Sequence, residues 1–176
     1  VEKAIANLEG AGALSPAALR QLPLAELASL VHPSGYYNAK ALKLKALARH
    51  LEGYGDSLER LFDRETAPLR QELLSIHGVG EETADSIILY AAHQPIFVVD
   101  AYTRRILRRL GLAPAGGSYQ AFQSLFMTAL PHDEALFNEY HALLVAHGKT
   151  TCRKTPVCDR SPLRELCPFL AQTGVS

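Results

Sequence analysis

Apolar residues recur along most of the chain at the three- and four-residue spacing that buries one face of a helix. This spacing predicts a long helix over roughly 37–51, a helix that begins directly after Gly80 and another over about 133–147. The one run that favours an extended strand is Ile96–Val99. The apolar stripes are Leu44, Leu47 and Leu51; Ala84, Ile87, Ile88 and Ala91; Phe122, Leu125, Phe126 and Ala129; and Phe137, Tyr140, His141 and Leu144. The pattern therefore predicts an all-α protein, with His141 as a hydrogen-bonded core histidine.

Several helix starts carry their own sequence signals. Ser15-Pro16 pairs a capping serine with a proline in the first turn, and Thr66-Ala67-Pro68 begins the first helix of the hairpin. The segment Asp-Ser-Leu-Glu at 56–59 matches a capping box. These signals predict helices that begin near residues 16, 57 and 66.

The stretch 73–109 places a glycine turn, a helix, an apolar run, one acid and an arginine-rich helix in succession. Its turn is Gly78-Val79-Gly80, and glycine permits positive φ and a close approach by another chain. The free N–H groups of the helix that follows favour an anion such as a DNA phosphate. Asp100, between the apolar run and the next helix, is either an N-cap or a partly desolvated, ionised carboxylate. Spacing alone favours the cap.

Charge and composition only slightly restrict the possible partners and location of the protein. The chain has 18 basic and 18 acidic residues, and a net charge of zero argues mildly against a nucleic-acid partner. A basic face is still possible, because two clusters concentrate the positive charge: Arg104, Arg105, Arg108 and Arg109, and then Lys149, Arg153, Lys154 and Arg160. No apolar run approaches membrane length and no signal peptide is visible, so we expect a cytoplasmic protein with no membrane partner.

Three features, which follow one another along the chain as they do in the family, resemble the helix-hairpin-helix DNA glycosylase superfamily (HhH-GPD), in its endonuclease III-like form. The first is the Gly-Val-Gly turn, followed about twenty residues later by Val98-Val99-Asp100. The second is the segment Pro33–Lys40, which looks like the family's glycine-aromatic-x-asparagine-x-lysine segment. The third is the cysteine-bearing C-terminus. The sequence of residues 78–90 and 98–105 is most similar to the branch that contains 3-methyladenine DNA glycosylases.

The resemblance implies two helical subdomains with a C-terminal cysteine loop. Residues 1–30 would hold the N-terminal helices of the cluster-side subdomain, and residues 31–130 a helical barrel with the hairpin at 66–92 and the aspartate loop at 93–110. Residues 131–176 would hold the last helix and the iron–sulfur-type loop. The chain opens with Val1 rather than Met, so we expect further residues of the N-terminal subdomain upstream.

The resemblance also assigns roles to individual residues. Asp100 would be the catalytic acid, and Glu82 takes the place of the lysine that forms a Schiff base in bifunctional members. A carboxylate cannot form an imine, so lyase activity should be absent or weak. For Glu82 the alternative is an ordinary first-turn acid, which is equally compatible with its position. The expected DNA contacts are Gly78, Val79, Gly80, Thr83, Arg104, Arg105 and Lys149.

All three cysteines, Cys152, Cys158 and Cys167, lie in the last 25 residues. In an intracellular protein such a group favours a metal or iron–sulfur site over disulfides. The resemblance implies a [4Fe-4S] cluster with four cysteine ligands, and the missing ligand falls at Ser161. Either the cluster persists with three cysteines and another ligand such as Ser161, or the loop is vestigial. The preserved spacing favours the first alternative.

The function predicted on these grounds is base excision repair. A monomeric DNA glycosylase would flip a damaged base, expected to be an alkylated one, out of double-stranded DNA and hydrolyse its N-glycosidic bond with Asp100. It would act in the cytoplasm, on the nucleoid if the source is bacterial or archaeal. The alternatives are an endonuclease III-type glycosylase and lyase for oxidised pyrimidines, a lyase that uses another lysine such as Lys149, and a non-catalytic DNA-binding module.

Overall fold

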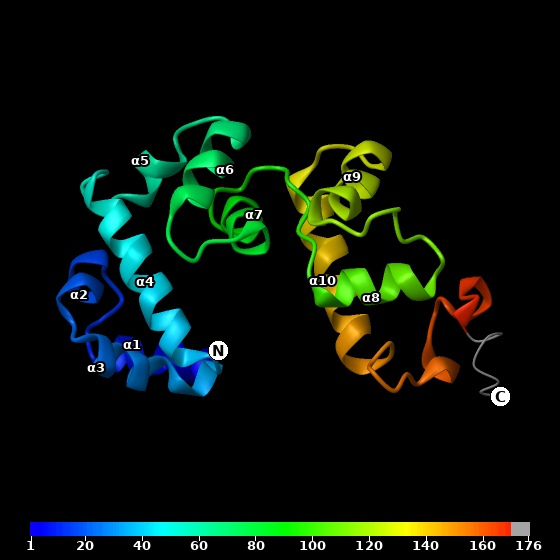
Figure 1. The fold of residues 1–176 in the computed structure, drawn as a ribbon, viewed down its shortest axis with the longest axis horizontal. Coiled ribbons are helices and arrows are strands. Elements are labelled where there is room, and N and C mark those ends of the chain that lie inside the picture. The colour runs from blue at the N-terminus through cyan, green and yellow to red at the C-terminus, as the bar shows by residue number, and fades with distance from the viewer. Residues whose placement is uncertain (170–176) are drawn as a thin grey trace. The chain divides into compact units, whose positions relative to one another are not determined.

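The computed structural model describes residues 1–169, and every regular element in that range is helical, which confirms the all-α prediction. The chain divides into two compact units, with the boundary in the sequence between Gly80 and Glu81. Figure 1 shows the elements of each unit in chain order. The division into 1–30, 31–130 and 131–176 stays a prediction. Within the described range, no helix is both long and apolar enough to cross a membrane.

The first unit is built on one long helix, α4, against which α2 and α3 pack, while α1 packs on α3. Its core contains Leu8, Leu27, Val31 and Ala41, all less than one-tenth exposed. The elements are α1 (Glu2–Gly10), α2 (Pro16–Gln21), α3 (Leu24–Val31), the 3₁₀ turn η1 (His32–Ser34), α4 (Tyr37–Glu52), α5 (Leu58–Phe62) and α6 (Thr66–Ser75). The predicted starts of α2 and α6 are confirmed, and Ser15 caps α2 by accepting from the Ala18 N–H at 3.2 Å.

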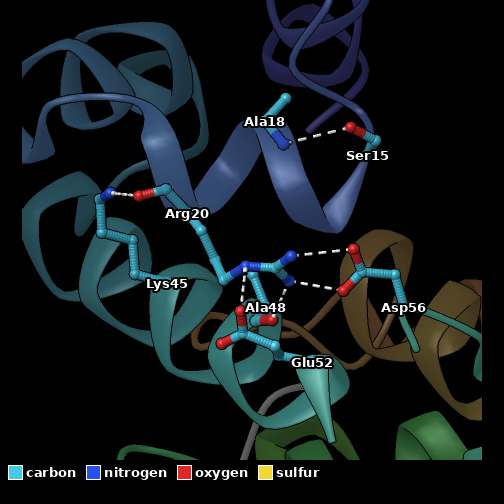
Figure 2. Close-up of polar contacts among 7 residues, drawn as sticks. All are labelled: Ser15, Ala18, Arg20, Lys45, Ala48, Glu52 and Asp56. Carbon is cyan, nitrogen blue, oxygen red and sulfur yellow. Dashed lines mark hydrogen bonds and ion pairs between the residues drawn. The ribbon is translucent and has the colours of Figure 1, made fainter. Parts of the chain in front are cut away.

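The predicted capping box at 56–59 is wrong by one residue. Ser57, not Asp56, caps α5, and its hydroxyl accepts from the Arg60 N–H at 3.2 Å. Asp56 has a positive φ of 62° and turns its carboxylate to Arg20, whose two terminal nitrogens donate to it at 2.5 and 2.8 Å (Figure 2). This hydrogen-bonded pair holds the pKa of Asp56 below its ordinary value. A bidentate partner 36 residues away therefore prevails over the local cap.

The second unit surrounds the run Ile96–Val99, whose four side chains are buried. The Phe97 ring stacks on Phe126 with centroids 3.8 Å apart, and Phe137 meets it edge-on at 5.6 Å. The elements are α7 (Glu81–Tyr90), α8 (Ala101–Arg109), α9 (Tyr119–Ala129), α10 (Glu134–Thr150) and the 3₁₀ turns η2 (Cys158–Arg160) and η3 (Arg164–Leu166).

The residue types of the run Ile96–Val99 favour a strand, but the run forms none within the described chain. Side chains bond two of its backbone groups, and the Ile96 N–H donates to the Gln94 carbonyl at 2.9 Å. Gln123 Nε2 donates to the Phe97 carbonyl at 2.7 Å, and the Val99 N–H donates to the Tyr119 hydroxyl at 3.2 Å. Two residues of α9 thus fix the segment that leads into α8.

The buried face of α7 also differs from the predicted stripe. The buried residues are Ala84, Asp85, Ile88 and Leu89, whereas Ala91 is exposed because the helix ends at Tyr90. Asp85 is fully buried, and its Oδ2 accepts from Gln123 Nε2 at 2.7 Å. The same Gln123 amide therefore joins α7 to the run that precedes Asp100.

Candidate active site

Asp100 ends the buried run and begins α8. Its Oδ1 accepts hydrogen bonds from the Thr103 N–H at 2.7 Å and from the Thr103 hydroxyl at 2.9 Å. The residue is only 9% exposed, and Thr103 is fully buried. Asp100 is therefore an N-cap, as the spacing predicted, and it is also partly desolvated at a helix N-terminus, where the dipole favours a negative charge.

The other carboxylate oxygen faces a buried histidine. Asp100 Oδ2 lies 3.8 Å from Nε2 of His141, which belongs to the middle of α10. The opposite ring nitrogen, Nδ1, is hydrogen-bonded to the hydroxyl of Tyr90 at the end of α7. Burial lowers the pKa of His141, while the negative Asp100 acts in the opposite direction. His141 is thus the predicted hydrogen-bonded core histidine, but its position beside Asp100 was not foreseen.

The glycine turn closes the first unit. The Val79 N–H donates to the Ile76 carbonyl at 3.0 Å, and Gly78 has a φ of +81°. A Cβ on Gly78 would lie 2.7 Å from Cγ of Lys43, so the turn packs closely on the side chain of an α4 residue. Gly78 and Gly80 are exposed, while Val79 is buried. The predicted positive φ is therefore found at Gly78, while the close approach by another chain stays a prediction.

The first turn of α7 presents its acids at the surface. Glu82 and Thr83 are exposed, and Glu81 accepts a hydrogen bond from the Gln120 amide of α9. The Glu82 carbonyl accepts from the Ser86 hydroxyl at 2.6 Å, within the helix. Glu82 thus stands in the first helical turn after the glycines, as the sequence predicted.

The predicted DNA contacts on α8 have internal partners. Arg104 donates to the Gly117 carbonyl at 2.9 Å and lies over the Phe122 ring. Arg105 donates to the Gly148 and Cys152 carbonyls, both at 2.8 Å. The structure therefore gives both guanidiniums a role within the protein, and a DNA contact by either stays a prediction. Lys149, in the last turn of α10, is exposed.

Gly148 was not singled out from the sequence, yet it determines how closely α8 and α10 approach. A Cβ at this position would lie 2.5 Å from Cδ1 of Tyr102, the second residue of α8. Only a glycine fits against that ring without a shift of one helix. A sequence signal was available, because a glycine inside a helical pattern weakens the helix and usually has a packing reason.

Residues 1–132 match the profile of the HhH-GPD superfamily of base excision DNA repair proteins. The chain belongs to this superfamily. Over 169 residues it is 44% identical to a Methanocaldococcus jannaschii protein named "Putative DNA repair glycosylase", covering 95% of this chain and 77% of the relative. This match and the profile make it a member of the DNA glycosylase family.

Solved structures of HhH-GPD proteins share its fold. A non-covalent endonuclease III–DNA complex superposes with a TM-score of 0.76 at 26% identity, over 90% of this chain and 71% of that chain. The H. pylori 3-methyladenine DNA glycosylase (MagIII) bound to 1,N6-ethenoadenine superposes with a TM-score of 0.70 at 27% identity, over 84% and 75%. The fold and family predicted from the three sequence features are confirmed, and the roles of single residues stay predictions.

The cysteine loop of this HhH-GPD chain is attached to α8 by arginine. Arg109 donates to Cys152 Sγ at 3.2 Å and to the Arg153 and Lys154 carbonyls at 2.6 and 2.9 Å. The Cys167 thiol donates to the Arg109 carbonyl at 3.5 Å. Both ends of the loop therefore contact the last turn of α8 through hydrogen bonds within the protein.

The donor set of the loop does not fit a four-thiolate cluster. Cys152, Ser161 and Cys167 line one cavity of about 20 Å³, and the Ser161 hydroxyl accepts from the Leu163 N–H at 3.1 Å. Within residues 1–169, no three Cys, His, Asp or Glu side chains gather as a metal-binding group. A cubane with one thiolate for each iron needs four. The predicted cluster with Ser161 as a ligand therefore stays a prediction, and no chemistry is assigned to it.

Proposed function

We propose that this chain is a monofunctional DNA glycosylase that releases alkylated bases from double-stranded DNA, with Asp100 as its catalytic residue. The observation that carries the proposal is the state of the Asp100 carboxylate. It is 9% exposed and anchored by Thr103 through one oxygen, and it stands at a helix N-terminus that favours its ionised form. A fixed, ionised and partly desolvated carboxylate is suited to act on a developing positive charge.

The chemistry would use water as the nucleophile. As the bond between C1′ and the base nitrogen breaks, its electron pair leaves with the base and positive charge develops on the sugar. The Asp100 carboxylate stabilises that charge and takes a proton from the attacking water, whose oxygen bonds to C1′. A cationic alkylated purine leaves as a neutral base, so it needs no protonation by the enzyme.

The lyase half of the chemistry is not expected. Glu82 occupies the first turn after the glycines, where the bifunctional members resembled by this sequence carry a lysine. Its carboxylate cannot form the imine that leads to strand cleavage. The MagIII structure supports an alkylated substrate, because that protein is named for 3-methyladenine and was solved with 1,N6-ethenoadenine.

Contacts with DNA would come mainly from the backbone of the glycine turn. Exposed Gly78 and Gly80, together with Thr83 at the start of α7, would bind phosphate without reading sequence. Exposed Lys149 would add a positive charge. We expect the protein to act as a monomer on chromosomal DNA in the cytoplasm.

A second candidate is an endonuclease III-type glycosylase for oxidised pyrimidines. The observation in its favour is the fold match to the endonuclease III–DNA complex, which is as good as the match to MagIII. The absence of a lysine at Glu82 argues against its lyase step. Use of another lysine, such as Lys149, would restore that step.

A substrate panel tests the proposal. Duplexes carrying 3-methyladenine, 1,N6-ethenoadenine or an oxidised pyrimidine are incubated with the purified chain, and the free base is quantified by chromatography. We expect release from the alkylated duplexes and little from the oxidised one. Release from the oxidised pyrimidine alone would support the second candidate. Binding without any release would identify a DNA-binding module instead.

A further inference from the structure

His141 stands between Tyr90 and Asp100, and its two ring nitrogens face different partners. The Tyr90 hydroxyl is hydrogen-bonded to Nδ1, and Asp100 Oδ2 lies 3.8 Å from Nε2. Nε2 is buried and has no hydrogen-bond partner among residues 1–169. Most buried polar nitrogens are paired, so an unpaired nitrogen aimed at a candidate catalytic carboxylate requires an explanation.

The tyrosine determines which nitrogen carries the proton. A neutral imidazole has one N–H and one acceptor nitrogen. If Tyr90 donates to Nδ1, the proton of His141 is on Nε2 and faces the Asp100 carboxylate, which is attractive. The opposite tautomer would direct a lone pair at that carboxylate across 3.8 Å, which is repulsive. Electrostatics therefore favours the Nε2–H form.

The charge state of His141 follows from its surroundings. Burial lowers its pKa below the ordinary value, and the negative Asp100 raises it. The titratable side chains that interact with it in the described chain are Tyr90, from α7, and Asp100, ahead of α8. Burial also raises the pKa of Tyr90, so the phenol keeps the proton that it donates. At neutral pH His141 is therefore neutral.

We propose that His141 is a positioning residue for Asp100, with its tautomer set by Tyr90, and that its Nε2–H orients and stabilises the free carboxylate oxygen. Thr103 already holds Oδ1 with two hydrogen bonds, so Oδ2 is the oxygen left to meet the sugar and the water. A neutral donor aimed at Oδ2 favours its ionised form without cancelling its charge. This inference rests on the proposed catalytic role of Asp100.

The test compares four variants under single-turnover conditions on the alkylated duplex over pH 5–9. His141→Leu removes the donor, His141→Gln keeps an amide N–H near the position of Nε2, and Tyr90→Phe removes the group that sets the tautomer. Tyr140→Phe is the matched control, because it removes the hydroxyl of the neighbouring α10 residue, whose ring packs on Phe97. Thermal unfolding of each variant is measured alongside.

We expect His141→Leu to lose about 10-fold in rate at neutral pH, because the N–H dipole 3.8 Å from Oδ2 is removed from a poorly solvated site. The acid limb of its pH–rate profile should shift to higher pH, because Asp100 would protonate more easily. His141→Gln should recover part of both effects, Tyr90→Phe should lose less, and Tyr140→Phe should match the wild type. An unchanged rate and acid limb in a folded His141→Leu would overturn the inference.

A readout independent of activity separates this inference from the proposed function. Imidazole ¹⁵N shifts of the wild type should report an Nε2–H tautomer at His141, and Tyr90→Phe should mix the two tautomers. The side-chain ¹³C signal of Asp100 should titrate at a higher pH in His141→Leu than in the wild type. If the wild type releases no base yet these shifts occur, the function fails and the positioning stands. An Nδ1–H tautomer or an unmoved Asp100 titration would refute the positioning.

Discussion

Helix α8 carries a different kind of site at each of its ends. At its N-terminus, Asp100 is buried and each of its oxygens has a defined neighbour, Thr103 on one side and His141 on the other. At its C-terminus, Arg109 holds a half-buried loop by its backbone carbonyls, and the cysteines of that loop share no common ligand position among the described residues. Side-chain contacts define the N-terminal end, whereas hydrogen bonds to backbone carbonyls hold the loop at the C-terminal end.

This difference shows which features depend on local structure. The Asp100 end is assembled from the cap, the buried run and two helices that pack beside it, so it is complete within the second unit. The cysteine end contains donors whose geometry would have to change to bind a metal together. We therefore expect the first end to tolerate changes in the second, while changes at Asp100 should abolish function without loss of fold.

The largest expected effect is the loss of catalysis in Asp100→Asn. Asparagine is as good an N-cap as aspartate, so the thermal midpoint should change little. Base release should fall by about 10²- to 10⁴-fold, because the charge that stabilises the sugar and activates water is gone. Asp133→Asn is the matched control, since Asp133 caps α10 with the same 2.7 Å bond to a backbone N–H but is exposed. Equal activity in the two variants would refute the catalytic role.

The next largest effect is on stability. Gly148→Ala should cost about 1–3 kcal/mol of unfolding free energy, because the new Cβ would overlap the Tyr102 ring beside Asp100. Gly10→Ala is the control, since a Cβ there meets nothing within 4 Å and should be neutral or slightly stabilising. Chemical denaturation measures both values. A Gly148→Ala variant as stable as Gly10→Ala would show that the two helices are not in close contact.

A smaller effect is expected at the cysteine end. Ser161→Cys would complete four thiols at the spacing of the loop, whereas Ser161→Ala would remove the hydroxyl. Iron per chain after anaerobic purification should follow the order Cys, Ser, Ala, because a serine hydroxyl is harder to deprotonate than a thiol. Base release by the three proteins should be similar. Equal iron content across the series would contradict this account of the fourth position.

The smallest expected effect is a dependence of stability on pH. Burial lowers the pKa of His141 and of His147, so the unfolded chain binds protons that the folded chain resists. This contribution is complete above the unfolded histidine pKa of about 6.5 and is lost as pH falls toward the lowered folded values. The thermal midpoint should therefore fall modestly between pH 7 and pH 5.5. His147→Gln should show a shallower fall, and a slope as steep as that of the wild type would be inconsistent with it.

The sequence was sufficient for features that depend on short-range patterns. The cap at Asp100, the positive φ at Gly78 and the helical class all follow from a few neighbouring residues. It was insufficient where a distant partner decides. Asp56 pairs with Arg20 instead of capping the helix, and the apolar run forms no strand in the described chain, where Gln123 and Tyr119 bond two of its backbone groups. The pairing of His141 with Asp100 is of this second kind, since 41 positions separate them.

The most direct test of the central claim is the state of the DNA strand after excision. The wild type is incubated with an alkylated duplex, with and without borohydride, and the strand is analysed by mass spectrometry. If Asp100 acts through water, the product is an uncleaved strand with an abasic sugar, and borohydride traps no protein–DNA adduct. A cleaved strand together with a trapped adduct would show that a lysine performs the chemistry and would contradict the account.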